Sequence, residues 1–191
     1  MNPRPPPHIV DKAARVRLII LDVDGVLTDG RLYYGDDGNE YKSFYSRDGH
    51  GLKMLQAHGV DIAILSGRSS IATARRMAEL NVRHVYLGIE DKLSVFSTFL
   101  EQQGLHAEQV AYVGDDVIDL PVMARVGFAI AVADADPFVK RHAHWQTPNP
   151  GGHGAVRDVC ELILHAQGQL STVQAQYWPL PDDGSTSWSE G

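Results

Sequence analysis

The sequence predicts an α/β fold in which a Rossmann-like parallel sheet is sandwiched by helices. Short runs rich in Val, Leu and Ile, without polar alternation, alternate with segments of helical periodicity. This alternation is typical of right-handed βαβ units, which build a parallel sheet covered on both faces. The 191 residues, 43% hydrophobic and 21% charged, suffice for one domain with a sizeable core.

The first elements are two buried strands with a hairpin and a helix between them. The turn-forming cluster Gly35-Asp36-Asp37-Gly38 predicts that the flanking segments 31–34 and 41–45 pair as a hairpin. A helix is expected over residues 51–58, ended by Gly59. The two strands are continuous apolar runs, at residues 16–23 and 60–65.

The rest of the domain continues the alternation of helix and strand. Ser70 is a suitable cap for a helix over residues 70–80, and Gly104 ends a helix over 91–103. A last helix, 155–167, has an apolar face that includes Val159 and Cys160. The remaining expected elements are the strands 82–87, 109–113 and 127–132 and the helices 117–126 and 137–142.

Two tails flank the predicted domain, residues 15–168. Residues 1–14 are Pro-rich and are expected to form a flexible tail. Residues 169–191 form a second tail with Tyr177, Trp178 and Trp188 among polar residues. The aromatic residues suggest that Tyr177 and Trp178 dock, with a neighbouring subunit as the expected partner.

Composition excludes several classes of function. The net charge of −7, from 17 Lys and Arg against 24 Asp and Glu, argues against broad binding to nucleic acid or to an anionic membrane. The early apolar run at residues 18–23 is too short to span a bilayer, so a cytoplasmic protein is expected. A single cysteine, Cys160, excludes an intramolecular disulfide and a multi-cysteine metal site.

Polar clusters follow three of the predicted strands. They are Asp22-Val23-Asp24, Ser66-Gly67-Arg68 and Gly114-Asp115-Asp116, and we expect them to meet at the carboxyl edge of the sheet. Asp22 and Asp24, two residues apart on an extended chain, point the same way. Such a pair suits covalent phosphoryl transfer, with one carboxylate as nucleophile and the other as general acid and base.

Four segments in order resemble the signatures of the haloacid dehalogenase superfamily. They are the segment from Asp22 to Thr28, the strand end Ile64 to Arg68, Lys92 at the start of a helix, and the segment from Gly114 to Asp119. In this superfamily a cap domain is often inserted between signatures. Only residues 25–65 and 67–91 separate the first three here, so no cap domain is expected.

The chemistry of these residues supports the resemblance. Asp22 and Asp115, with the backbone carbonyl of Asp24, offer the oxygen ligands that Mg²⁺ prefers. Ser66 would hydrogen-bond a phosphate oxygen, and Lys92 would neutralise another and keep Asp22 ionised. Two further carboxylates have a supporting role. Asp119 holds metal-bound waters or orients Lys92, and Asp116 contacts the metal's outer sphere or caps the next helix.

A narrower resemblance covers roughly residues 16–170. Segments 21–30, 44–51, 112–123, 131–135 and 151–160 resemble the 3-deoxy-D-manno-octulosonate 8-phosphate (KDO 8-phosphate) phosphatases. The resemblance implies Mg²⁺-dependent hydrolysis of this sugar-acid phosphate in the pathway to lipopolysaccharide. It also implies a homotetramer in which the hairpin and a neighbour's C-terminal tail complete the site.

The same resemblance implies a set of substrate contacts. Besides Asp24 and Lys92, the implied residues are Tyr45, Ser46, Arg47, Asp48, Gly49, Lys53, Gly67, Arg68 and Arg76. The cations among them would bind the sugar carboxylate or the phosphate. The sequence departs from the family at His153, where the family's closing motif has arginine, so an anion contact there becomes weaker or pH-dependent.

Two other functions remain alternatives. A phosphatase for a related nonulosonate (sialic-acid-type) 9-phosphate would share the fold, metal and signatures and differ in the sugar loop. A catalytically idle subunit that donates a lid or binds a partner would be expected to lack one of Asp22, Asp24, Lys92 and Asp115, all of which are present. Nucleic-acid end processing is disfavoured by the net charge of −7.

Overall fold

Six parallel strands form the central sheet of the protein, as a computed structural model that describes residues 5–178 shows. The strand order is β5-β4-β1-β6-β7-β8. The strands are β1 (Leu18–Leu21), β4 (Asp61–Ser66), β5 (His84–Leu87), β6 (Val110–Gly114), β7 (Phe128–Ala131) and β8 (Trp145–Gln146). The predicted parallel sheet is confirmed, and β8 is an additional short edge strand.

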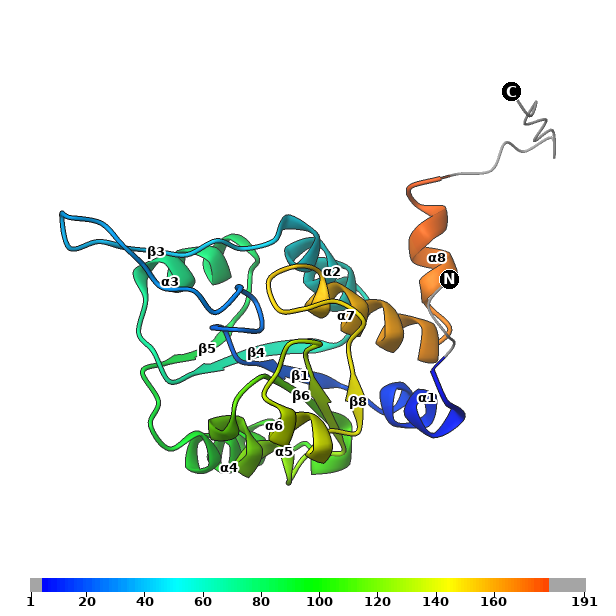
Figure 1. Ribbon diagram of the computed structural model, residues 1–191. Helices are drawn as coiled ribbons and strands as arrows, with labels where there is room; N and C mark the ends of the chain where they lie inside the picture. The colour runs from blue at the N-terminus through cyan, green and yellow to red at the C-terminus, as the bar shows by residue number, and fades with distance from the viewer. Residues whose placement is uncertain (1–4, 179–191) are drawn as a thin grey trace.

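Helices cover both faces of the sheet (Figure 1). Above it in this view lie α2 (Ser46–Ala57), α3 (Ile71–Glu79) and α7 (Ala155–Ala166), and below it lie α4 (Lys92–Gln103), α5 (Leu120–Met123) and α6 (Pro137–His142). Two short 3₁₀ helices, η1 (Ala107–Gln109) and η2 (Val117–Asp119), flank β6. The result is the predicted three-layer sandwich.

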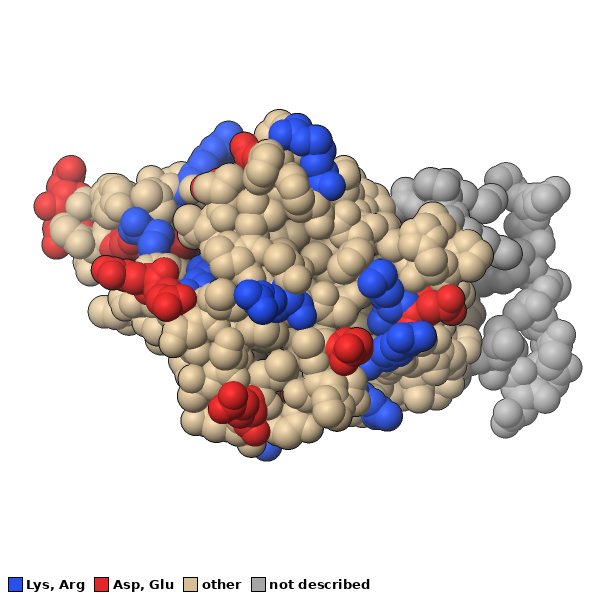
Figure 2. Space-filling model, turned by 90° about the horizontal axis from the view of Figure 1, so that it is seen from below, with Lys and Arg blue, Asp and Glu red and all other residues tan. Residues whose placement is uncertain are grey.

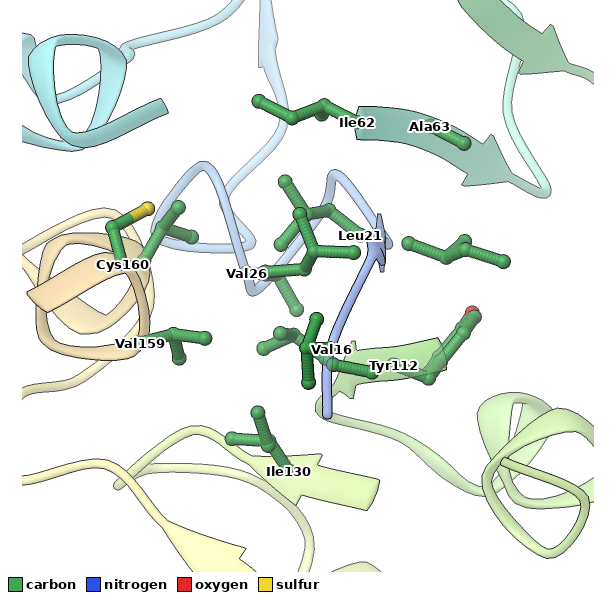
Figure 3. Packing of buried hydrophobic residues seen from close by; sticks show 14 of the residues in the cluster. Val16, Leu21, Val26, Ile62, Ala63, Tyr112, Ile130, Val159 and Cys160 are labelled. Carbon is green, nitrogen blue, oxygen red and sulfur yellow. The ribbon is translucent and has the colours of Figure 1, made fainter. Parts of the chain in front are cut away.

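The core lies between the sheet and these helices. All four residues of β1 and of β7 are buried, which explains why these strands are continuous apolar runs. Figure 3 shows Val26, in the loop after β1, lying between Leu21 and Cys160 of α7. Through this packing α7 supports the loop that carries the first polar cluster.

Local signals set the helix ends where the sequence predicts them. Ser70 Oγ accepts a hydrogen bond from the Thr73 amide at 3.5 Å and begins α3. Asp91 Oδ1 accepts one from the Ser94 amide at 3.0 Å and begins α4. Gly104 ends α4 with a φ of 63°, a conformation that glycine adopts without strain.

The N-terminal region differs from expectation. Residues 1–14 are predicted as a flexible tail, but α1 (Pro7–Ala14) is a helix that packs on α7. Its Ile9 and Ala13, four residues apart, are both buried, and the Lys12 ammonium donates to Gly127 O at 2.9 Å. The prediction is wrong for α1 because the Pro-rich composition obscured this short apolar stripe.

Two helix boundaries are also corrected. The helix expected over residues 117–126 is only the 3₁₀ turn η2 followed by the one-turn helix α5, and Pro121 stands at the start of α5. The helix expected over residues 51–58 begins earlier, at Ser46 of α2. Glycines at 49 and 51 lower helix propensity there, but the buried Asp48 and Leu52 hold the segment against the core.

The predicted hairpin is present as β2 (Tyr33–Tyr34) and β3 (Glu40–Tyr41), an antiparallel pair. It projects beyond α3 at the upper left of Figure 1. Residues 5–178 contain no separate cap domain, as the motif spacing predicts.

The C-terminal part of the described chain is the helix α8 (Leu170–Ala175), which packs on α7 through the buried Val173. The Tyr177 ring meets the His50 ring of its own chain edge-on, with centroids 5.4 Å apart. Trp188 lies outside the described residues, and docking on a neighbouring subunit stays a prediction.

The charge pattern agrees with the composition. Figure 2 shows Lys and Arg side chains in several separate groups, among neutral and acidic residues, on the face seen from below. None of the helices within residues 5–178 has the length and hydropathy needed to cross a membrane.

Candidate active site

The three polar clusters meet where the chain changes direction in the sheet. From β1 the chain moves outward to β4 and β5, then crosses back to β6 on the other side of β1. Ligands of such sheets bind beyond the carboxyl ends of the strands at this switch point. A pocket of about 260 Å³ lies there, lined by Asp22, Asp24, Gly30, Leu32, Ser66, Gly67, Arg68, Asp115, Asp116 and Ile118.

Asp22 stands at the base of this pocket, at the end of β1. Its amide donates to Val113 O on β6 at 3.1 Å, so the sheet itself fixes its backbone. Its buried carboxylate pairs with the Lys92 ammonium at 3.0 Å. Lys92 is the first residue of α4, which covers the face of the sheet opposite to α2, α3 and α7.

Asp119 orients Lys92, one of the two roles predicted for it. The Lys92 ammonium lies 2.8 Å from Asp119 Oδ1, which also accepts a hydrogen bond from the Tyr112 hydroxyl at 2.7 Å. The Asp115 amide donates to Asp119 Oδ2 at 3.0 Å. Asp119 is fully buried, and these partners compensate its charge.

Burial and mutual repulsion shape the charges of this cluster. Burial, reinforced by Asp119, raises the pKa of Asp22 to about 6 even though Lys92 opposes the shift. Burial and the charges of Asp119 and Asp22 raise the pKa of Asp115 to about 8. Burial alone would lower the pKa of Lys92, but the Asp119 and Asp22 carboxylates more than offset it.

These carboxylates fit a divalent cation. One oxygen each of Asp22, Asp115 and Asp119 lies within 4.8 Å of the others. Asp119 already has its partners, whereas Asp115 Oδ1 is buried and accepts no hydrogen bond from any residue that the structure describes. Carboxylate oxygens are the ligands that Mg²⁺ prefers, so the predicted ligands Asp22 and Asp115 suit this ion.

Two glycines allow the close packing around these ligands. Gly25 has a φ of 91°, and a Cβ there would lie 2.1 Å from Asp115 Oδ2. A Cβ on Gly151 would lie 1.7 Å from Gly25 O. The loop before α7 therefore presses against the loop that carries Asp24.

Two cations hold Asp24: Arg68, which the sequence analysis predicted as a substrate contact, and Lys42, which it missed. Its Oδ1 pairs with the Lys42 ammonium, and its Oδ2 lies 3.9 Å from Arg68 Nε. Glu40 of the hairpin joins the two cations, at 2.7 Å from Arg68 Nη2 and 3.4 Å from Lys42 Nζ. The Arg68 guanidinium also donates to the Tyr34 hydroxyl at 3.2 Å. No local pattern marks Lys42 or Glu40, because hairpin register determines this contact.

Ser66 and Asp116 occupy the pocket as predicted. Ser66 is buried, and its Oγ accepts from the Arg68 amide at 3.4 Å, which leaves the hydroxyl hydrogen for another acceptor. Asp116 Oδ1 accepts from the Val117 amide at 2.7 Å, so Asp116 caps η2, which is one of its two predicted roles, and its contact with the metal's outer sphere stays a prediction.

The predicted sugar loop does not join this pocket within one chain. Asp48 is buried and its Oδ1 accepts from the Arg157 amide at 2.8 Å, so it joins α2 to α7. Tyr45 and Arg47 line a separate cavity of about 570 Å³, together with His153. Ser46 is the first residue of α2.

The remaining predicted cations also lie elsewhere. Arg76 packs against Gly49 and pairs with Glu79 at 3.3 Å. Lys53 lines a cavity near Asp61 and His84, at the amino ends of β4 and β5 and opposite the pocket. The substrate roles of these residues, and of the Tyr45–Gly49 loop, stay predictions that depend on a second subunit.

Comparisons with known proteins agree with this geometry. Residues 88–157 match the family model described as haloacid dehalogenase-like hydrolase. A 3-deoxy-D-manno-octulosonate 8-phosphate phosphatase of Salmonella typhimurium is 47% identical over 170 residues, which is 89% of this chain and 90% of the relative. The corresponding Escherichia coli K12 protein is 46% identical over 168 residues, covering 88% of this chain and 89% of the relative.

Solved structures give the same picture. A Yersinia pestis phosphatase of this name superposes with a TM-score of 0.85 at 46% identity, over 86% of this chain and 89% of that chain. A Moraxella catarrhalis phosphatase of this name, solved with a magnesium ion, a phosphate ion and a KDO molecule, gives a TM-score of 0.87 at 39% identity. That superposition covers 88% of this chain and 97% of the other.

Proposed function

The chain belongs to the 3-deoxy-D-manno-octulosonate 8-phosphate phosphatases among the haloacid dehalogenase-like hydrolases, and we propose that it hydrolyses this ester to KDO and phosphate. The observation that carries the proposal is the assembly of Asp22, Ser66, Lys92 and Asp115 at one strand edge, in a chain 47% identical to a phosphatase of this name. The expected role is the dephosphorylation step toward lipopolysaccharide.

Each residue has a defined part in this reaction. A carboxylate oxygen of Asp22 attacks phosphorus, the phosphorus–oxygen ester bond breaks, and Asp24 gives a proton to the departing sugar alcohol. Asp24 then takes a proton from the water that attacks the aspartyl phosphate, which releases phosphate and restores Asp22. Ser66 donates to a phosphate oxygen and Lys92 neutralises another.

Mg²⁺ is the cofactor, and Asp22 and Asp115 would hold it with the backbone carbonyl of Asp24. When bound, this cation supplies positive charge that lowers the repulsion between the anionic nucleophile and the phosphate. The orphaned Asp115 Oδ1 supports this assignment.

Substrate identity is tested by phosphate release from a panel of sugar phosphates with added Mg²⁺. The panel includes KDO 8-phosphate, a nonulosonate 9-phosphate and common hexose phosphates. We expect the highest kcat/KM with KDO 8-phosphate. A higher value with the nonulosonate 9-phosphate would reject the substrate but keep the reaction, and no turnover of any ester would reject the enzyme assignment in favour of a binding subunit.

The assembly extends the proposal beyond one chain. We propose a cytoplasmic homotetramer in which the hairpin and a neighbour's C-terminal tail close the open pocket. Two observations support this. The pocket has no cap domain above it among residues 5–178, and the hairpin exposes the apolar surfaces of Leu32, Tyr33, Tyr34 and Tyr41. A monomer with full activity at assay concentration, seen by light scattering, would reject it.

A further inference from the structure

The Lys42 side chain is almost completely buried although Lys42 follows an exposed hairpin. Its side chain is 1% exposed, whereas Tyr34 and Tyr41 of the same hairpin are well exposed. Removing an ammonium group from water costs several kcal/mol. Nearby carboxylates can offset a cost of that order through their attraction to the ammonium. The compensating groups here are Asp24 and Glu40. An exposed hairpin thus delivers a buried cation to one carboxylate of the active site.

The active site consequently has two lysines, one paired with each carboxylate of the first polar cluster. Lys92, from α4, pairs with the nucleophile Asp22. Lys42, from the hairpin, pairs with Asp24, the residue that protonates the leaving alcohol. The two lysines therefore pair with different carboxylates, Lys92 with the nucleophile and Lys42 with the proposed acid.

Asp24 is confined by a closed ring of charges. Lys42 contacts its Oδ1, and Arg68 Nε stands 3.9 Å from its Oδ2. Glu40 accepts a hydrogen bond from Arg68 at 2.7 Å and forms an ion pair with Lys42 at 3.4 Å, so it links the two cations. The hydrogen bond from the Arg68 guanidinium lowers the pKa of Glu40, so Glu40 stays ionised and keeps its partners. The ring leaves the Asp24 carboxylate little freedom to rotate.

We propose that Lys42 is a positioning residue that holds the Asp24 carboxylate in the pocket, with Glu40 fixing Lys42. Proton transfer needs the acid within about 2.6–3.2 Å of the leaving oxygen. A misplacement of about 1 Å costs roughly a hundredfold in rate. The inference rests on the proposed function only through the reaction type, phosphomonoester hydrolysis with Asp24 as acid, and not through the identity of the sugar.

The experiment compares two classes of leaving group. An alkyl phosphate such as glycerol phosphate needs a proton on its leaving oxygen, whereas 4-nitrophenyl phosphate departs with little help. Lys42→Met removes the charge at similar length, and Lys42→Arg restores it. Arg83→Met is the matched control, because Arg83 pairs with Asp61 at 3.7 Å at the opposite edge of the sheet.

With saturating Mg²⁺, Lys42→Met should lower kcat for the alkyl phosphate about 10- to 100-fold, with KM unchanged. For the aryl phosphate the loss should stay within about threefold. Lys42→Arg should recover most of the alkyl activity, and Arg83→Met should match the wild type for both esters.

Two results would overturn the inference. Equal losses for both esters, accompanied by a lower Tm, would make Lys42 a purely structural residue. A raised KM with unchanged kcat would make it a substrate-binding residue instead. Neither ester in this comparison is KDO 8-phosphate. If the wild-type enzyme prefers another sugar phosphate, the proposed substrate is wrong, but the test of Lys42 remains valid.

Discussion

Asp22 and Asp115 follow the adjacent strands β1 and β6, with carboxylate oxygens within 4.8 Å of each other, and both lie in an environment that disfavours their charge. Burial raises the pKa of Asp22 to about 6 and that of Asp115 to about 8. Lys92 stabilises the ionised form of each, but Asp119 adds a third negative charge. A bound divalent cation removes this conflict, so the two residues suit a loaded site better than an empty one.

The nucleophile is tested by replacing one atom. Asp22→Asn keeps the shape of the side chain but cannot form an aspartyl phosphate, so turnover of every phosphate ester should fall to background. The measurement is phosphate release, with circular dichroism to show that the fold is intact. A variant retaining more than about a tenth of wild-type activity would contradict covalent catalysis by Asp22.

Single residues differ in how well the sequence predicts them. Asp22, Ser66, Lys92 and Asp115 were predictable because each stands at the end of a strand or the start of a helix, and the structure brings them together. Lys42 was not, because its partner Asp24 lies across a hairpin whose register no local pattern fixes. The sequence predicts Tyr112 only as a strand residue, and the hydrogen bond from its hydroxyl to Asp119 is evident only in the structure.

At the scale of elements, Asp48 joins the beginnings of α2 and α7. Its carboxylate is buried and accepts a hydrogen bond from the Arg157 amide. Burial, only partly opposed by this hydrogen bond, raises its pKa to about 6 from the ordinary 3.8. Asp48 Oδ2 has no hydrogen-bond partner among the described residues. Ionisation of Asp48 at this junction between two helices therefore lowers the free energy of unfolding.

The direction of the pH effect follows from these pKa values. Between pH 4 and 6 the folded protein holds the Asp48 proton more tightly than the unfolded chain, so ionisation lowers stability as pH rises. The shift corresponds to a loss of about 3 kcal/mol in the free energy of unfolding across this range. Asp48→Asn cannot ionise and still accepts the Arg157 hydrogen bond, so it should lack this loss.

Urea unfolding of wild type and Asp48→Asn from pH 4 to 7, at saturating Mg²⁺, measures the difference. The stability of the variant relative to the wild type should increase with pH. Parallel pH profiles would mean that Asp48 is ionised throughout, with an unshifted pKa.

Elements were predicted well where packing and caps agree. The strand ends and the boundaries of α3, α4 and α6 follow from apolar runs and capping residues. The segment after β6 was not predicted, because Pro121 and the hydrogen bonds to Asp119 favour a tight 3₁₀ turn over a regular helix. Likewise α1 depends on the surface of α7, which the N-terminal sequence does not reveal.

At the scale of the whole molecule, the metal ligands couple separate parts of the fold. Asp22 follows β1 and Asp115 follows β6, and the loop before α7 packs on Gly25 between them. Unfolding disperses these ligands, so a cation that binds them stabilises the whole domain.

Metal removal tests this coupling. Chelation with EDTA should abolish activity and lower Tm, and Mg²⁺ should restore both. At a concentration 100 times its Kd, Mg²⁺ should add about 2.7 kcal/mol to the free energy of unfolding. Asp115→Asn is the control, because it should lose the Mg²⁺-dependent rise in Tm. Full activity in EDTA, with metal analysis showing a metal-free protein, would contradict the carboxylate–metal site.

The role of the C-terminal tail is tested by truncation after Trp178. This removes residues 179–191 and retains α8, whose Val173 is buried. If a neighbour's tail closes the pocket, KM for KDO 8-phosphate should rise while hydrolysis of 4-nitrophenyl phosphate is unchanged. A truncated protein with wild-type KM for both esters would contradict the closing role, and deletion from residue 169 should in addition lower Tm.

The position of Cys160 gives the molecule a built-in reporter of its own opening. It is the only cysteine in the chain, and it is fully buried in α7, where a Cβ on Gly51 of α2 would lie 3.3 Å from its own Cβ. Burial raises the pKa of its thiol, so the reactive thiolate is almost absent in the folded state. A thiol-specific reagent should therefore label the native protein only as fast as α7 separates from the elements packed against it, α2 among them. The labelling rate then measures how often α7 opens, without any engineered probe.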